Sequence, residues 1–186
     1  MKKNLGFTLI ELMVVISILA ILAVSFFVNF KSFGEDAALK NAASDIQSAL
    51  RLAQSNALSG VKCGNEGGVP WSIQFRDRST FNLICSISGS LDPSIIRRWS
   101  IPLPIYISEI YAVRPNACTS SFTPSGTISS TITINFSYSE GKATFIDTAK
   151  DCLGKSTGLV IKLKNNNNDA ALKTVTLDKG GSVDVQ

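Results

Sequence analysis

Apolar residues run almost unbroken from Phe7 to Phe30, a stretch of 24 residues in which Glu11 is the one charged side chain. An unbroken helix of that length spans about 36 Å, enough to cross a hydrocarbon core of about 30 Å. Because the apolar residues surround the whole helix, it belongs in lipid or in a bundle of similar helices. Lys2 and Lys3 precede it, and the positive-inside rule keeps that end in the cytoplasm. The pattern therefore predicts a transmembrane helix, Phe7 to Phe30, with the rest of the chain outside the cytoplasm.

A different periodicity follows in residues 31–60. Lys31 to Asp36 interrupts the apolar run, and Gly34 is a candidate kink. Beyond it, apolar residues recur at helical spacing, with polar residues between them: Leu39, Ala42, Ala43, Ile46, Ala49, Leu50, Ala53 and Ala57. The pattern ends near Ser59 and Gly60, as helices often do. We expect one long helix whose first half is transmembrane and whose second half packs on a domain.

After Gly60 the spacing changes to alternation of apolar and polar residues, which is typical of strands with one buried face. Three hairpins are predicted: Trp71–Arg76 with Phe81–Cys85, Ile132–Tyr138 with Lys142–Asp147, and Gly158–Lys164 with Lys173–Asp178. Their turns are expected at Asp77–Ser79, Ser139–Gly141 and Asn165–Asp169. Ile95–Ala112 is strand-like, but Pro102 and Pro104 interrupt it, which suits an edge or a crossing between elements. The sequence predicts an α+β fold with an antiparallel β-sheet domain over residues 61–186.

Composition and charge narrow the function. The chain of 186 residues is 45% hydrophobic and 17% charged, which excludes a disordered protein. A formal net charge of +4 is too small to indicate a nucleic-acid binder. The absence of His removes the usual base of nucleophilic catalysis and the commonest zinc ligand. No nucleophile–base set is evident, so we expect no enzyme, no cofactor and no metal.

Three interpretations of the apolar run compete. A cleaved secretory signal would be shorter and would end in a small-x-small site, whereas Ala20 and Ala23 have the wrong spacing. A plain signal anchor leaves Glu11 unexplained, because a carboxylate in the membrane core costs about 2.5–3.5 kcal/mol even on lenient scales. The third interpretation is a segment cut ahead of the apolar run, which would give Glu11 a cationic partner.

The segment Gly6-Phe7-Thr8-Leu9-Ile10-Glu11-Leu12 resembles the processing site of type IV prepilins and pseudopilins. The resemblance implies that a membrane-embedded prepilin peptidase removes residues 1–6 by cutting between Gly6 and Phe7, and that it then methylates the Phe7 amine. It also implies that Glu11 pairs with this new ammonium group on a neighbouring subunit, because each buried charge needs a partner. It further implies that the protein spans the inner membrane once and later assembles with other pilins into a filament.

The second half of the chain looks like the pseudopilin H and FimT-like minor pilins. The likeness rests on Ser48–Ala57 leading into Cys63, on Trp71–Phe75, on Phe122–Gly126 and on the terminal Gly180-Gly181-Ser182-Val183. It implies a structural subunit of a type II secretion pseudopilus or of a type IV pilus, which the sequence does not separate. A DNA-binding or adhesive tip module is the alternative. Some FimT-like pilins bind DNA through arginines near the C-terminal end, where this chain has none, and we expect Arg97 and Arg98 in a solvated turn beside Trp99.

Four cysteines, Cys63, Cys85, Cys118 and Cys152, are placed outside the cytoplasm by the export signal, where disulfides persist. They allow three connectivities. We predict Cys63–Cys85 and Cys118–Cys152, because these pairs join sequential elements, which are usually neighbours. Four buried free thiols are the alternative.

Overall fold

The computed structural model describes residues 8–86, 94–113, 119–121, 127–147 and 156–186, and of residues 25–33, 119–121, 127–130, 147 and 168–170 it describes the backbone alone. The chain forms two compact units, Met1–Ala37 and Ala38–Gln186. One helix, α1 (Leu9–Leu58), contributes residues to both units, and Gly34 is helical within it. The helix ends as predicted, because Gly60 adopts a φ of 63°, the left-handed conformation that commonly follows a helix.

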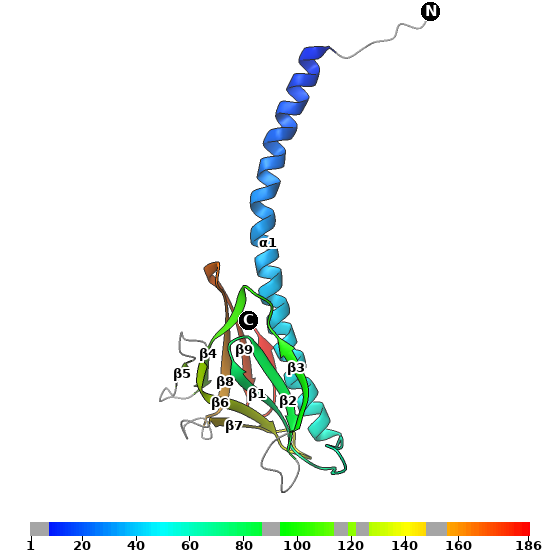
Figure 1. Ribbon diagram of the computed structural model, residues 1–186, viewed down its shortest axis with the longest axis vertical. Helices are drawn as coiled ribbons and strands as arrows, with labels where there is room; N and C mark the ends of the chain where they lie inside the picture. The colour runs from blue at the N-terminus through cyan, green and yellow to red at the C-terminus, as the bar shows by residue number, and fades with distance from the viewer. Residues whose placement is uncertain (1–7, 87–93, 114–118, 122–126, 148–155) are drawn as a thin grey trace, which may run out of the picture. The chain divides into compact units, whose positions relative to one another are not determined.

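The second unit contains two antiparallel sheets (Figure 1). The first sheet has the order β3-β2-β1-β6-β7 and the second has the order β10-β9-β8-β4-β5. The strands of the first sheet are β1 (Trp71–Asp77), β2 (Thr80–Cys85), β3 (Ser94–Ser100), β6 (Thr127–Phe136) and β7 (Ala143–Asp147). The strands of the second sheet are β4 (Ile105–Val113), β5 (Thr119–Ser121), β8 (Gly158–Asn165), β9 (Asn168–Asp178) and β10 (Val183–Val185).

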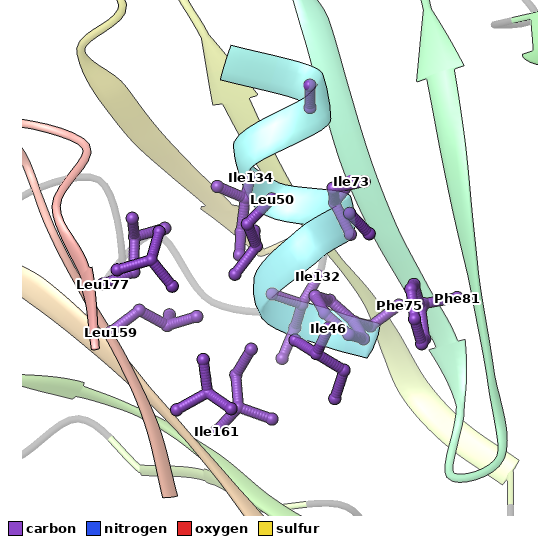
Figure 2. Packing of buried hydrophobic residues seen from close by; sticks show 14 of the residues in the cluster. Ile46, Leu50, Ile73, Phe75, Phe81, Ile132, Ile134, Leu159, Ile161 and Leu177 are labelled. Carbon is purple, nitrogen blue, oxygen red and sulfur yellow. The ribbon is translucent and has the colours of Figure 1, made fainter. Parts of the chain in front are cut away.

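A single hydrophobic core joins the C-terminal part of α1 to the inner faces of both sheets. All eight apolar positions predicted for the inner face of the helix, from Leu39 to Ala57, are at most 1% exposed. Figure 2 shows Ile46 and Leu50 of α1 beside Ile73, Ile132 and Ile134 of the first sheet, with Leu159, Ile161 and Leu177 of the second sheet gathered on the other side. The small alanines of the helix allow this close approach, and each buried Ile or Leu contributes about 1.5–3 kcal/mol.

Backbone hydrogen bonds also connect the two sheets. Ile107 N of β4 donates to Arg78 O, in the turn between β1 and β2, at 2.9 Å. On the opposite side of the first sheet, Ala143 N donates to Lys179 O (3.0 Å), which follows β9. The sheets are therefore fastened to each other at places that are distant in sequence.

Polar side chains of α1 hold the C-terminal strand. Gln47 Nε2 donates to Val183 O at 3.1 Å, and Arg51 reaches the same carbonyl at 3.5 Å. Gln54 Nε2 donates to Gly141 O at 3.2 Å. Gly181 has a φ of 86°, which favours glycine, and a Cβ there would come within 2.9 Å of the backbone oxygen of Gly141. The terminal turn therefore needs glycine at this position.

The three predicted hairpins are present, and the first two have their predicted turns. Strand β9 begins at Asn168, five residues before the predicted start, because the turn joining it to β8 is shorter than the sequence suggested. The prolines at 102 and 104 do mark a crossing: β3 and β4 lie on either side of them and belong to different sheets. The expectation that Arg97 and Arg98 lie in a turn was wrong, because both are in β3 and pair with Leu83 and Asn82.

Candidate functional site

Glu11 lies at the start of α1 and is hydrogen-bonded to Thr8. Its Oε2 atom accepts the Thr8 backbone N–H at 3.0 Å and the Thr8 hydroxyl at 2.9 Å, while Thr8 Oγ1 accepts the Glu11 N–H at 3.3 Å. This reciprocal arrangement is a capping box, which satisfies N–H groups that have no partner within the helix. Thr8 is not among the site residues predicted from the sequence, although Thr-x-x-Glu ahead of an apolar run is the pattern that identifies such a box.

The apolar side chains of α1 are exposed over the described part of its N-terminal half. The described large apolar side chains from Leu9 to Val24 are all half exposed or more, from 50% for Leu22 to 77% for Leu9. The hydroxyl of Ser17, the one serine side chain described in this stretch, donates a hydrogen bond to Met13 O of the same helix at 2.7 Å. Apolar surface of this extent requires lipid or other apolar helices around it.

Some predicted features fall outside the described residues. These features are the leader (residues 1–6), the junction of Gly6 with Phe7, and the cysteines Cys118 and Cys152. Among the residues that are described, no helix reaches the length and hydropathy expected of a membrane span, and the span from Phe7 to Phe30 stays a prediction. In the same part of the chain, no three Cys, Asp or Glu side chains are grouped so as to hold a metal ion.

The structure contains the predicted Cys63–Cys85 disulfide, with Cα atoms 6.0 Å apart. Cys63 lies in the segment after α1, where Cys63 N donates to Glu66 O, and Cys85 ends β2. Both sulfur-bearing residues are buried, at 1% and 0% exposure. The bridge therefore ties the segment that leaves the helix to the first sheet.

The two arginines of β3 are held by neighbouring side chains. The guanidinium carbon of Arg97 lies 4.7 Å from the ring centre of Trp99, and the Trp99 ring stacks on Phe81 at 5.3 Å with the planes 10° apart. Arg98 donates through Nε to Asn82 Oδ1 at 3.0 Å. Both arginines are exposed, and since consecutive strand residues point to opposite faces, their side chains lie on opposite faces of the sheet.

Comparisons with known proteins concern the N-terminal segment and the fold. The family model of the prokaryotic N-terminal methylation motif matches residues 1–27. The crystal structure of the type IV minor pilin FimU of Pseudomonas aeruginosa is similar to this chain, with a TM-score of 0.50 and 16% identity over 83% of this chain and 92% of that one. The fold is pilin-like. A second crystal form of FimU gives a TM-score of 0.47 and 15% identity over 80% of this chain and 92% of that one. A search of curated proteins found no significant match.

Proposed function

We propose that the protein is a structural subunit, a minor pilin or pseudopilin, of a type IV filament system. The observation that carries the proposal is the combination of an N-terminal methylation motif with a pilin-like fold in one chain. Both support a structural role rather than an enzymatic one. Within this class we favour the pseudopilin H and FimT-like group, in either a type II secretion pseudopilus or a type IV pilus.

The proposed subunit has four parts. Residues 1–6 form the leader, and residues 7–30 form the helix of the membrane and the filament core. Residues 31–60 form the amphipathic continuation of that helix, and residues 61–186 form the β-rich domain. The chain resides in the inner membrane with its C-terminal domain outside the cytoplasm. Its partners are the prepilin peptidase and methyltransferase, the membrane lipid and the other pilins of the filament.

Assembly transfers the apolar helix from lipid to a bundle of similar helices, and the exposed apolar surface from Leu9 to Val24 fits both environments. Cleavage after Gly6 creates an ammonium group at Phe7, close to the apolar layer. Glu11 of a neighbouring subunit is its proposed partner, because an unpaired charge in such a bundle is costly. The contacts with Thr8 hold the Glu11 carboxylate at the N-terminal end of the helix.

A DNA-binding tip module has weaker support. Single-strand binding proteins stack bases on free aromatic rings. The ring of Trp99 is already stacked on Phe81 and lies under Arg97, so it does not offer such a platform.

Processing tests the proposal directly. Protein isolated from membranes that contain the cognate peptidase should begin at Phe7 and carry one methyl group on its amine, as measured by intact mass and N-terminal peptide analysis. Membranes without the peptidase provide the control and should yield the chain with residues 1–6 attached. Cleavage near Ala23, or an unprocessed chain in the presence of the peptidase, would contradict the assignment.

A further inference from the structure

Strand β3 is an edge of the first sheet, and its only neighbour in the described part of the chain is β2. A strand in this position presents a row of backbone N–H and C=O groups that a further strand can pair with. The second, third, fourth and fifth residues of β3 are all exposed, and the exposed fractions are 47% for Ile95 and 51% for Ile96.

Two of the other edge strands make hydrogen bonds outside their own sheet. The carbonyl of Val183 in β10 accepts hydrogen bonds from Gln47 and Arg51 of α1. The first residue of β7, Ala143, donates to Lys179. Strand β3 has no comparable contact among the described residues. Its pairing with β2 shifts register between Leu83 and Ile84, which places a bulge at Ile96, and the pairing is regular from Arg97 to Ser100.

The side chains of β3 indicate what it can accept. Arg97 is held over Trp99 and Arg98 is held by Asn82, so both guanidinium groups are positioned before a ligand arrives. Positioned arginines bind carboxylates well because less rotational freedom is lost on binding. The pair is consecutive, so a strand laid against β3 meets one positive charge on each of its faces, next to two isoleucines.

We propose that β3 binds an extended acidic segment of a partner protein by strand addition. The segment pairs with the backbone of β3, carries acidic residues at two consecutive positions opposite Arg97 and Arg98, and places apolar side chains opposite Ile95 and Ile96. Main-chain hydrogen bonds supply affinity in this mode of recognition, and the side chains supply specificity. The proposal does not depend on filament assembly, because the probe below binds the isolated subunit.

The experiment uses the full chain in detergent micelles and a fluorescent seven-residue peptide with two consecutive glutamates followed by two valines. Fluorescence anisotropy should detect saturable binding that weakens as salt is added, because salt screens exposed charge pairs. Replacing both arginines, Arg97→Glu with Arg98→Glu, should lower the affinity at least about tenfold. Arg76→Glu is the matched control, since Arg76 is exposed on β1, which has a strand on each side.

Two further probes separate strand addition from simple charge attraction and from misfolding. A peptide with two lysines in place of the glutamates should bind the double variant better than it binds the original protein, which a damaged fold would not do. A glutamate peptide with alternate backbone amides methylated should lose binding, because the methyl groups remove the donors that pair with β3. Equal binding of the methylated peptide would overturn the proposal.

Three other outcomes would also overturn it. Absence of peptide binding to the original protein would leave Arg97 and Arg98 as charges that merely protect an edge from aggregation. Arginine-dependent binding of a single-stranded oligonucleotide, with none of the peptide, would assign the strand to nucleic acid. Arginine-dependent self-association of the subunit, again without peptide binding, would assign it to a second copy.

Discussion

Among single residues, Asp77 organises the turn that fastens the two sheets together. Its Oδ1 atom accepts hydrogen bonds from Ser79 N at 2.8 Å, Ser79 Oγ at 3.1 Å and Thr80 N at 2.6 Å, and its Oδ2 atom accepts the Thr80 hydroxyl. Partial burial raises the pKa of Asp77, but the hydrogen bonds from Thr80 and Ser79 outweigh burial and hold the pKa below its ordinary value. The same turn supplies the carbonyl groups that Ile101 and Ile107 bond to.

This geometry predicts a pH-dependent effect of Asp77→Asn. A carboxylate with a lowered pKa stabilises the fold at pH values above its unfolded pKa of about 3.9, and this contribution is lost as the pH falls through the folded pKa. The variant should be less stable at pH 7 by about 1 kcal/mol, the usual cost of losing a side-chain cap. The difference should shrink toward pH 3, as measured by urea unfolding at both pH values.

Asp184→Asn is the matched control, because Asp184 is an exposed acid on β10 and takes no part in the turn. If the two variants showed the same stability at both pH values, the role given to Asp77 would be wrong.

At the scale of elements, the Cys63–Cys85 bridge connects the segment after α1 to the end of β2. The two cysteines are separated by 22 positions in sequence. The neighbouring contacts support the same segment, since Trp71 Nε1 donates to Val61 O at 3.1 Å. The bridge therefore restrains a loop whose two ends are already fixed by a helix and a strand.

Removing this bridge should destabilise the domain substantially. Replacing Cys63 with Ser and Cys85 with Ala should lower the free energy of unfolding by about 3 kcal/mol, the value expected for a loop of this length. Chemical unfolding of the variant and of the original protein measures the difference.

Peptide mapping without reduction checks the pairing itself. It should recover a Cys63–Cys85 peptide from protein taken from the envelope, and it also tests the predicted Cys118–Cys152 pair. Four alkylatable thiols in native protein would refute both pairs and the stabilising role.

At the scale of the whole molecule, the proposed assembly step depends on Glu11. Glu11→Ala should leave membrane insertion and cleavage after Gly6 intact, because neither step requires the carboxylate, but it should reduce incorporation into filaments. Glu11→Asp should be intermediate, since it keeps the charge and shortens its reach. Immunoblotting of sheared filaments against the membrane fraction measures the incorporation of each variant.

Thr8→Ser is a suitable control, because serine keeps the hydroxyl that bonds to Glu11. If Glu11→Ala entered filaments as well as the original protein, at equal expression and cleavage, the ammonium–carboxylate pairing would have to be abandoned.

Much of the architecture was predictable because the spacing of apolar residues within one helix or hairpin depends only on residues close together in sequence. The helical spacing from Leu39 to Ala57 identified the buried face of α1 residue by residue. Alternation around Asp77–Ser79 and Ser139–Gly141 located two hairpins, since each turn joins strands that are adjacent in both sequence and space. The short strands β5 and β10 were missed, because three residues are too few to show a period.

The sequence by itself determined the order of the elements, the apolar face of the helix and the candidate processing motif, because each of these depends on residues within a few positions of one another. Only the tertiary structure decided that the chain between Ile95 and Ala112 divides between two sheets, and that Arg97 and Arg98 stand on an open edge. Neighbours in a sheet are chosen by hydrogen bonds and core packing between segments far apart in sequence, and no local pattern records which strand is left without a second neighbour.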